Sequence, residues 1–210
     1  MIKVVIVDDH AILRRGLTQI IAEIDDMEVV GEADSSAAAM RLLREHPCNV
    51  LLLDVTLPDR NGVETLKLVR KEFPKIQVLM LSMHPENQYA VRALKAGAAG
   101  YLTKQSAPAQ LVSAIRQVHQ GRKYVTPAVA EELAQNVDRD ADQPLHQTLS
   151  NREYQTMCMI ASGKSLTDIA HQMSLSVKTV SVYRARVLEK MRLKNNAELT
   201  HYAIRNQLVQ

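Results

Sequence analysis

The stretch VVIVDDHAILRRG, residues 4–16, passes from a run of four apolar residues directly into two adjacent aspartates, Asp8 and Asp9. A short apolar run followed by apolar residues at three- and four-residue spacing predicts a buried strand and then an amphipathic helix. Two neighbouring carboxylates at the end of a buried strand repel each other, so their position needs a chemical reason. The stretch therefore predicts a strand–helix unit with a functional site where the strand ends.

The same alternation of strand and helix patterns continues through residues 1–125. Strand-like segments lie at 3–9, 28–34, 49–55, 77–83 and 100–104, and segments with helical spacing separate them. The first, third and fourth segments are apolar nearly throughout, which is typical of central parallel strands covered on both faces by helices. We therefore predict an α/β domain with a five-stranded doubly wound parallel sheet. Its ligand site is expected beyond the carboxyl ends of the strands.

The length and the charge distribution predict a second, smaller domain. With 210 residues, of which 46% are hydrophobic, the chain suits two modest domains. Residues 1–125 carry 16 basic and 14 acidic side chains, residues 126–149 carry 1 and 5, and residues 150–210 carry 9 and 4. The resulting net charges of +2, −4 and +5 indicate an acidic linker before a basic module. Such a module fits binding to a polyanion, and it also fits a merely solvated surface.

The N-terminus and the apolar runs indicate a cytoplasmic protein with no membrane partner. No apolar run approaches the roughly 20 residues that span a bilayer, and charge appears too early in MIKVVIVDDH for a signal peptide. Cys48 and Cys158 lie 110 residues apart with no further Cys or His at ligand spacing. We therefore predict reduced core thiols rather than a disulfide or a zinc site.

Polar residues follow four of the strand-like segments. The first segment ends with Asp8 and Asp9, the third with Asp54, the fourth with Ser82 and the fifth with Lys104. Taken singly, each aspartate fits a turn former or a helix cap. Together at one rim of a parallel sheet, the carboxylates predict a cation site, and an all-oxygen site suits Mg²⁺. Asp54 is then the predicted nucleophile toward a phosphoryl group, with Ser82 hydrogen-bonded to a phosphoryl oxygen.

These residues lie in motifs that resemble the receiver domain of two-component response regulators, a flavodoxin-like fold. The motifs are VDDH, LLLDVTLPDRNG, LSMH and AGAAGYLTK, within residues 1–122. The resemblance implies that Asp54 is the phosphoacceptor and that a sensor histidine kinase is the phosphodonor. It also implies a Mg²⁺ site formed by Asp8, Asp9, Asp54 and the backbone carbonyl of Thr56. A signalling switch is implied at Ser82, Tyr101 and Lys104.

Residues 150–208 show helical spacing and no strand pattern. Ser150 precedes Glu153 by three residues, a capping-box signature, and the helix that it opens is expected to stop at Gly163. A short helix over 166–173 and a longer helix over 177–190 are separated by a tight turn, as in a helix-turn-helix. Helical domains without DNA also contain such pairs. The cations on and after the second helix favour a recognition helix, which needs them to neutralise phosphates.

The sequence LSNREYQTMCMIASGKSLTDIAHQMSLSVKTVSVYRARVLEKMRLKN resembles the LuxR-type helix-turn-helix. With the receiver it resembles the NarL/FixJ class of response regulators, and the C-terminal motifs are most similar to the GacA/UvrY branch. The resemblance implies promoter DNA as a partner, a homodimer on activation with a contact from the last helix, and RNA polymerase as a further candidate partner. Ser181 and Ala185 are small where some relatives carry lysines. The implied DNA-binding residues are Lys178, Thr179, Ser181, Val182, Tyr183, Arg184, Arg186 and Lys190.

The sequence therefore predicts a phosphorylation-controlled transcriptional regulator rather than an enzyme. Its expected parts are a receiver domain at 1–122, a linker at 123–147 that is helical at its start, and a DNA-binding domain at 148–210. One alternative is a phosphate-independent DNA-binding regulator whose receiver does not signal. Another is a Mg²⁺-dependent phosphatase of the haloacid dehalogenase type. Such phosphatases need a second aspartate two residues after the nucleophile, and this chain has Thr56 there.

Overall fold

The computed structural model describes residues 1–83, 86–127, 129–131 and 144–209. The chain divides into two compact units, Met1–Ala134 and Gln135–Gln210. No helix in the described part of the chain is both long and apolar enough to cross a membrane.

The first unit alternates strands and helices along the chain. In order they are β1 (Ile2–Val7), α1 (Ala11–Ala22), β2 (Met27–Ala33), α2 (Ser36–Glu45), β3 (Val50–Asp54), α3 (Gly62–Glu72), β4 (Gln77–Ser82), α4 (Glu86–Lys95), β5 (Gly100–Thr103) and α5 (Ala107–His119). The predicted strands are confirmed, and each differs from its predicted range by no more than two residues at either end.

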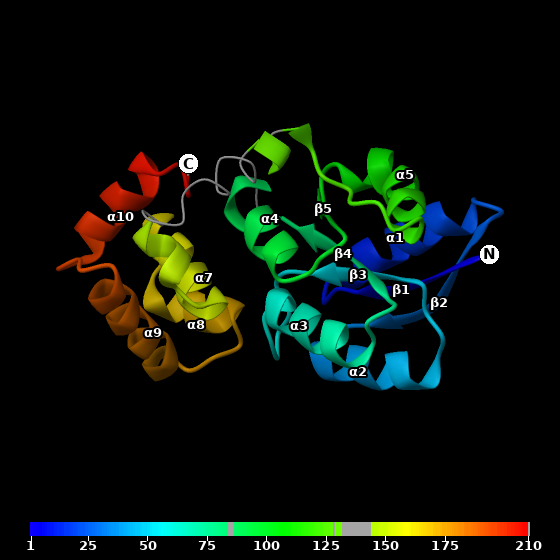
Figure 1. Ribbon diagram of the computed structural model, residues 1–210. Helices are drawn as coiled ribbons and strands as arrows, with labels where there is room; N and C mark the ends of the chain where they lie inside the picture. The colour runs from blue at the N-terminus through cyan, green and yellow to red at the C-terminus, as the bar shows by residue number, and fades with distance from the viewer. Residues whose placement is uncertain (84–85, 128, 132–143, 210) are drawn as a thin grey trace. The chain divides into compact units, whose positions relative to one another are not determined.

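The five strands form one sheet in the order β2-β1-β3-β4-β5, and every pair is parallel. Helices cover both faces, with α1 and α5 on one and α2 and α3 on the other (Figure 1). Apolar residues of β1, β3 and β4 pack against α1 and α5 in a buried core, which confirms the predicted doubly wound α/β fold. From β1 the chain adds β2 on one side of the sheet and then β3, β4 and β5 on the other side, so the strand order reverses between β1 and β3. The carboxyl ends of these two strands therefore lie at the topological switch point, where such sheets bind ligands.

The segment that follows α5 returns to the edge of the sheet. Tyr124 forms an isolated parallel bridge with Gly100 of β5, and its amide donates to the carbonyl of Ala99 at 2.9 Å. A Cβ atom on Gly100 would lie 2.7 Å from the carbonyl oxygen of Tyr124, closer than van der Waals contact allows. Glycine at this position therefore permits the close approach that covers the open edge of β5.

The second unit is helical. It contains the short 3₁₀ helix η1 (Leu145–Thr148) and the helices α7 (Asn151–Ala161), α8 (Leu166–Gln172), α9 (Val177–Lys190) and α10 (Asn196–Arg205). The predicted capping box at Ser150 and Glu153 opens α7, and the helix is followed by Gly163 with a positive φ of 81°. The α8–α9 pair confirms the predicted helix-turn-helix, since Ser176 caps α9 directly after a short turn. Val180 and Val187 on one side of α9 are fully buried, which fixes the side that remains exposed.

Candidate functional site

Two buried carboxylates meet at the switch point of the sheet. Asp8 directly follows β1 and Asp54 ends β3, and the two residues are 0% and 1% exposed. The ammonium nitrogen Nζ of Lys104 lies 2.7 Å from Asp8 Oδ2 and 2.9 Å from Asp54 Oδ2. The strand order predicts that these residues converge, and the structure brings them together. The Lys104 ammonium therefore forms ion pairs with two buried carboxylates.

Burial and the neighbouring charges shift the pKa values of both Asp54 and Lys104. Burial raises the pKa of Asp54 to about 7, the charge of Asp8 adds to this effect, and Lys104 opposes it. Burial alone would lower the pKa of Lys104, but the carboxylates of Asp54 and Asp8 outweigh it and raise that pKa above its ordinary value. The cluster thus holds a permanent ammonium and still carries more negative than positive charge. A cation would lower the electrostatic cost of this arrangement.

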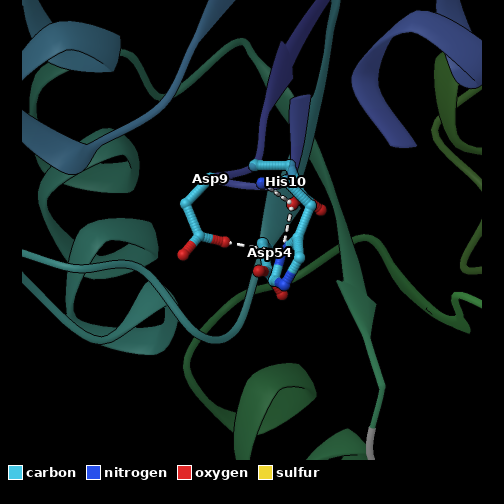
Figure 2. A group of neighbouring side chains, drawn as sticks. Asp9, His10 and Asp54 are labelled. Carbon is cyan, nitrogen blue, oxygen red and sulfur yellow. Dashed lines mark hydrogen bonds and ion pairs between the residues drawn. The ribbon is translucent and has the colours of Figure 1, made fainter. Parts of the chain in front are cut away.

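Asp9 and His10 complete the cluster at the start of α1. The imidazole Nδ1 of His10 lies 2.7 Å from Asp9 Oδ1 and 3.0 Å from Asp8 Oδ1. Figure 2 shows the side chains of Asp9, His10 and Asp54 gathered at the ends of β1 and β3. One ligand atom from each of Asp8, Asp9, His10 and Asp54 lies within 4.8 Å of the others. This spacing is compatible with a single coordination sphere.

The cluster fits a divalent cation. Asp8 Oδ2 is buried and pairs with the Lys104 ammonium at 2.7 Å. Because one ammonium faces two buried carboxylates, a metal ion beside them would offset the remaining negative charge. The backbone amide of Thr56 donates to the Asp54 carboxylate, so the segment that contains the Thr56 carbonyl is held at the same rim.

The loop after Asp54 is closed by specific backbone and side-chain contacts. The Gly62 amide donates to the carbonyl of Val55 at 2.8 Å, and the side chain of Asn61 caps α3 by accepting from the Val63 amide at 2.9 Å. A Cβ atom on Gly62 would lie 1.9 Å from the carbonyl oxygen of Asp54. No side chain fits at this distance. The final glycine of LPDRNG is therefore required by the close approach of two backbone segments beside the carboxylate cluster.

The three residues of the expected switch lie on β4 and β5 or directly after them. Ser82 and Tyr101 are buried, 1% and 2% exposed. The Lys104 amide donates to the carbonyl of Ser82 at 2.7 Å, which joins the ends of the two strands. The Tyr101 amide donates to the carbonyl of Tyr124 at 3.3 Å. The aromatic residue of the switch is thus hydrogen-bonded to the segment that leaves the sheet.

One exposed face of α9 carries three of the eight expected DNA-binding residues, Lys178, Ser181 and Val182. Lys178, Ser181, Val182 and Ala185 are exposed and recur at three- and four-residue spacing, so they share a face. Val182 is 43% exposed on this face. Arg186 is exposed beside this face, whereas Thr179 and Tyr183 are half-buried.

Two of the expected DNA-binding cations have partners within their own domain. The guanidinium Nε of Arg184 donates to Asn196 Oδ1 on α10 at 2.6 Å. The ammonium of Lys190 lies 2.7 Å from Glu153 Oε2 on α7. Burial alone would raise the pKa of Glu153, but Lys190 and the amide and hydroxyl of Ser150 lower that pKa below its ordinary value. Lys190 therefore stabilises the helical unit in addition to any contact that it makes with DNA.

Comparison with known proteins identifies both units. Residues 4–116 match the response regulator receiver domain family, and residues 147–203 match the luxR family of bacterial regulatory proteins. The response regulator UvrY of Escherichia coli is 37% identical over 209 residues, which cover 99% of this chain and 96% of UvrY. The response regulator GacA of Pseudomonas aeruginosa is 37% identical over 211 residues, which cover 100% of this chain and 98% of GacA. The chain is a two-component response regulator. It belongs to the NarL/FixJ class and, with these relatives, to the GacA/UvrY branch, as its sequence predicts.

Solved structures support the same assignment. The RcsB response regulator of Salmonella typhimurium is 26% identical to this regulator, with a TM-score of 0.63 and a match that covers 97% of this chain and 100% of RcsB. A structure of RcsB from Salmonella enterica serovar Typhimurium bound to a promoter in the presence of a phosphomimetic is 27% identical, with a TM-score of 0.64 and coverage of 96% and 97%.

His10 is the member of the regulator's cluster that sequence reasoning missed. It directly follows Asp9 in VDDH, so its proximity to the carboxylates was available as a signal. Periodicity assigns the residue to a loop or helix start and does not place its ring, which the structure puts between Asp8 and Asp9.

Proposed function

We propose that Asp54 of this regulator accepts a phosphoryl group from a sensor histidine kinase, and that the phosphorylated chain binds promoter DNA as a homodimer. The observation that carries the proposal is the buried Asp54 carboxylate, 2.9 Å from the Lys104 ammonium and within ligand distance of Asp8 and Asp9. Asp8, Asp9, Asp54 and the carbonyl of Thr56 would hold Mg²⁺, which when bound neutralises charge on the transferring phosphoryl group.

The side chains around Asp54 have separate tasks in this transfer. A carboxylate oxygen of Asp54 forms a bond to phosphorus while the bond to the donor nitrogen breaks, and the donor imidazole keeps that electron pair. The Lys104 ammonium stabilises charge on the phosphoryl oxygens without moving, since it already lies beside the acceptor. The hydroxyl of Ser82 would then hydrogen-bond a phosphoryl oxygen, and Tyr101 would respond behind it. Lys104, Ser82 and Tyr101 are in this way the proposed signalling set.

The proposed domain boundaries are a receiver at 1–122, a linker at 123–147 and a DNA-binding domain at 148–210. The family matches at 4–116 and 147–203 support the first and the last. Part of the proposed linker lies outside the described residues. We assign the chain a regulatory rather than a catalytic role and a cytoplasmic location, because its relatives are transcription regulators that would meet promoter DNA there.

DNA binding is proposed through the exposed face of α9, which would enter the major groove. Lys178 supplies a cation on that face and Arg186 supplies one beside it, with Thr179, Ser181 and Val182 nearby. Tyr183, Arg184 and Lys190 lie on its flanks and are proposed to contact the DNA backbone. RcsB, the structural relative, is known as dimers bound to DNA, which supports the dimer in this proposal. RNA polymerase is a further proposed partner, since a regulator at a promoter acts beside it.

Phosphorylation cannot favour DNA binding by direct attraction, because it adds negative charge to the receiver. It must instead change the population of a binding-competent or dimeric form. Pairing two half-site contacts makes the second contact intramolecular and can raise avidity by roughly a hundredfold. We therefore propose dimerisation as the route by which the signal reaches the DNA.

Labelling with a small phosphodonor tests the proposed acceptor. In the presence of Mg²⁺ and acetyl phosphate, the intact chain should gain one acid-labile phosphoryl group by mass spectrometry. Asp54→Asn should abolish the gain, while Asp25→Asn, at an exposed position on the loop before β2, should label like the wild type. Lys104→Ala should label more slowly and should fail to raise DNA affinity. Equal labelling of the Asp54→Asn variant would overturn the assignment.

DNA titrations of the fragment 145–210, the phosphorylated chain and the unphosphorylated chain distinguish dimerisation from masking of the DNA-binding domain. The fragment 145–210 should bind DNA without responding to phosphodonor. Weaker binding by this fragment than by the phosphorylated chain supports dimerisation through the receiver. Tighter binding by the fragment than by the unphosphorylated chain would instead show that the receiver masks the DNA-binding face.

A further inference from the structure

The chain that leaves α5 is attached to the outer edge of β5 by main-chain hydrogen bonds. The amide of Tyr124 donates to the carbonyl of Ala99 at 2.9 Å. Its own carbonyl accepts from the amide of Tyr101, within β5, at 3.3 Å. We call Lys123 and Tyr124 the clasp, because these two residues hold the start of the proposed linker on the sheet.

Side-chain contacts hold the clasp from three directions. The Tyr124 hydroxyl donates to Gln110 Oε1 on α5 at 3.0 Å, and Gln117 Nε2, also on α5, donates to the carbonyl of Lys123 at 2.6 Å. The Lys123 ammonium donates to the carbonyl of Ala98, in the turn between α4 and β5. The ring of Tyr124 packs against the buried core. The clasp therefore joins β5 and α5 to the chain that continues toward the DNA-binding domain.

The clasp can open without unfolding of the receiver. Its main chain makes two hydrogen bonds to the strand edge, and one of them is long at 3.3 Å. Lys123 is exposed and Tyr124 is only half-buried. Elements with few hydrogen bonds and partial burial open locally at a much smaller free energy than the whole domain. The closed and open forms of the clasp are therefore two states whose populations a modest bias can shift.

The strand that the clasp holds also carries the proposed signalling set. Tyr101, whose amide donates to the clasp, is buried. Lys104 directly follows the strand, where its ammonium pairs with Asp54 and its amide donates to the carbonyl of Ser82. A phosphoryl group on Asp54 would bind both the ammonium and the Ser82 hydroxyl, and would so fix the carboxyl end of β5. A fixed β5 offers Tyr124 a fixed partner, which favours the closed clasp.

We propose that Tyr124 is a positioning residue that carries the receiver's state to the DNA-binding domain, because phosphorylation of Asp54 favours the closed clasp. The inference rests on the proposed function, since the phosphoryl group supplies the bias. A closed clasp fixes the point and the direction in which the chain leaves the receiver. In a dimer, this restricts the positions that the two DNA-binding domains sample and raises the effective concentration of the second domain at its half-site.

A glycine substitution opens the clasp and leaves every residue of the clasp and the switch in place. A Cβ on Gly100 would lie 2.7 Å from the carbonyl oxygen of Tyr124, whereas a Cβ on Gly16 of α1 meets no atom of another element within 4 Å. Gly100→Ala and the matched control Gly16→Ala are phosphorylated as intact chains with acetyl phosphate and Mg²⁺, and their DNA affinities are measured with and without the phosphoryl group. Gly100→Ala should gain one phosphoryl group but lose about fivefold or more of the increase in affinity. Gly16→Ala should keep the increase.

A second pair of variants separates the clasp from the packing of the sheet. A Cβ on Gly100 would also lie 2.9 Å from Leu79 Cδ1, so Gly100→Ala also strains the core. Tyr124→Ala removes the ring and the bond to Gln110 without touching the strands, and it should lose the increase in affinity as Gly100→Ala does. Tyr124→Phe keeps the ring and the main-chain pairing and should recover most of the increase. Full increases in both Gly100→Ala and Tyr124→Ala would overturn the proposal.

Residue-resolved hydrogen exchange of the intact chain measures the clasp directly. The Tyr124 amide is protected only while the clasp is closed, so phosphorylation should slow its exchange by about fivefold or more. The Asn49 amide donates to the carbonyl of Lys3 at the opposite end of the sheet, and its exchange should change much less. Unchanged or faster exchange of the Tyr124 amide on phosphorylation would overturn the clasp as the output of the receiver. A wild type that gains no phosphoryl group, or no DNA affinity with one, would instead overturn the proposed function.

Discussion

Replacing Asp54 by asparagine should make the metal-free receiver more stable although it removes the proposed acceptor. Two buried carboxylates share the ammonium of Lys104, and the pKa of Asp54 is raised from its ordinary 3.8 to about 7. Each pKa unit corresponds to about 1.4 kcal/mol, so an ionised Asp54 destabilises the fold by at most about 4 kcal/mol. The raised pKa already includes the attraction of Lys104 for the carboxylate, so this figure is an upper bound on the gain. We therefore expect a net gain of about 2 kcal/mol in the free energy of unfolding.

The pH dependence of this gain has a defined sign. The native carboxyl binds its proton more tightly than the unfolded one, so wild-type stability falls as pH rises from the ordinary pKa toward the raised one, 3.8 to about 7. The stability of Asp54→Asn does not fall with pH in this way. Its gain in the free energy of unfolding over the wild type should therefore be largest above about pH 7. Millimolar Mg²⁺ should reduce the advantage, because a bound cation stabilises the wild-type carboxylates.

Native-state hydrogen exchange measures this effect in the intact chain. Amides of β1 and β3, buried beside the cluster, exchange through large-scale unfolding of the receiver and report its stability. The comparison needs the wild type, Asp54→Asn and the exposed-site control Asp25→Asn, each with a chelator and with Mg²⁺. Equal protection of wild type and Asp54→Asn with the chelator above about pH 7 would refute the claim that the ionised Asp54 is a source of strain.

Further predictions concern the loop, the DNA surface and the thiols. Gly62→Ala places a Cβ 1.9 Å from the carbonyl oxygen of Asp54 and should cost about 3 kcal/mol or more of stability, so an unchanged melting temperature would contradict the close backbone approach in this loop. Lys190→Ala should cost about 1 kcal/mol through loss of the partly exposed ion pair with Glu153. If Lys190 also contacts phosphate, that variant should lower the slope of log affinity against log salt by about one. Arg186→Ala should lower the slope without the stability cost, and unchanged slopes in both variants would place the DNA face elsewhere. Burial raises the pKa of the Cys48 thiol to about 12, so iodoacetamide should label it far more slowly in the native than in the unfolded chain, as mass spectrometry can show.

The sheet and the helix-turn-helix could be predicted because their signals are local. Apolar runs such as NVLLLDV predict buried parallel strands, and the chain then brings Asp8, Asp54 and Lys104 to one rim by topology alone. Ser150 and Glu153 lie three residues apart, so the cap that they form can also be inferred from spacing.

The contacts between side chains of different elements could not be predicted in this way. Lys190 and Glu153 are 37 residues apart, and their pairing depends on how α9 packs on α7 rather than on the pattern of either helix. The sharing of Lys104 by two carboxylates likewise depends on side-chain geometry at the sheet's rim. For Gly62, the motif indicates a loop, but only the structure shows the carbonyl that excludes a side chain.

The central claim is that phosphorylation of Asp54 controls DNA binding, and a single equilibrium titration tests it most directly. The intact regulator is titrated onto a promoter fragment selected from genomic DNA by the phosphorylated protein, with and without acetyl phosphate and Mg²⁺. The wild type should bind at least about tenfold more tightly with the phosphodonor, while Asp54→Asn should bind with the same affinity in both conditions. Equal affinity of the wild type with and without a verified phosphoryl group would contradict the account.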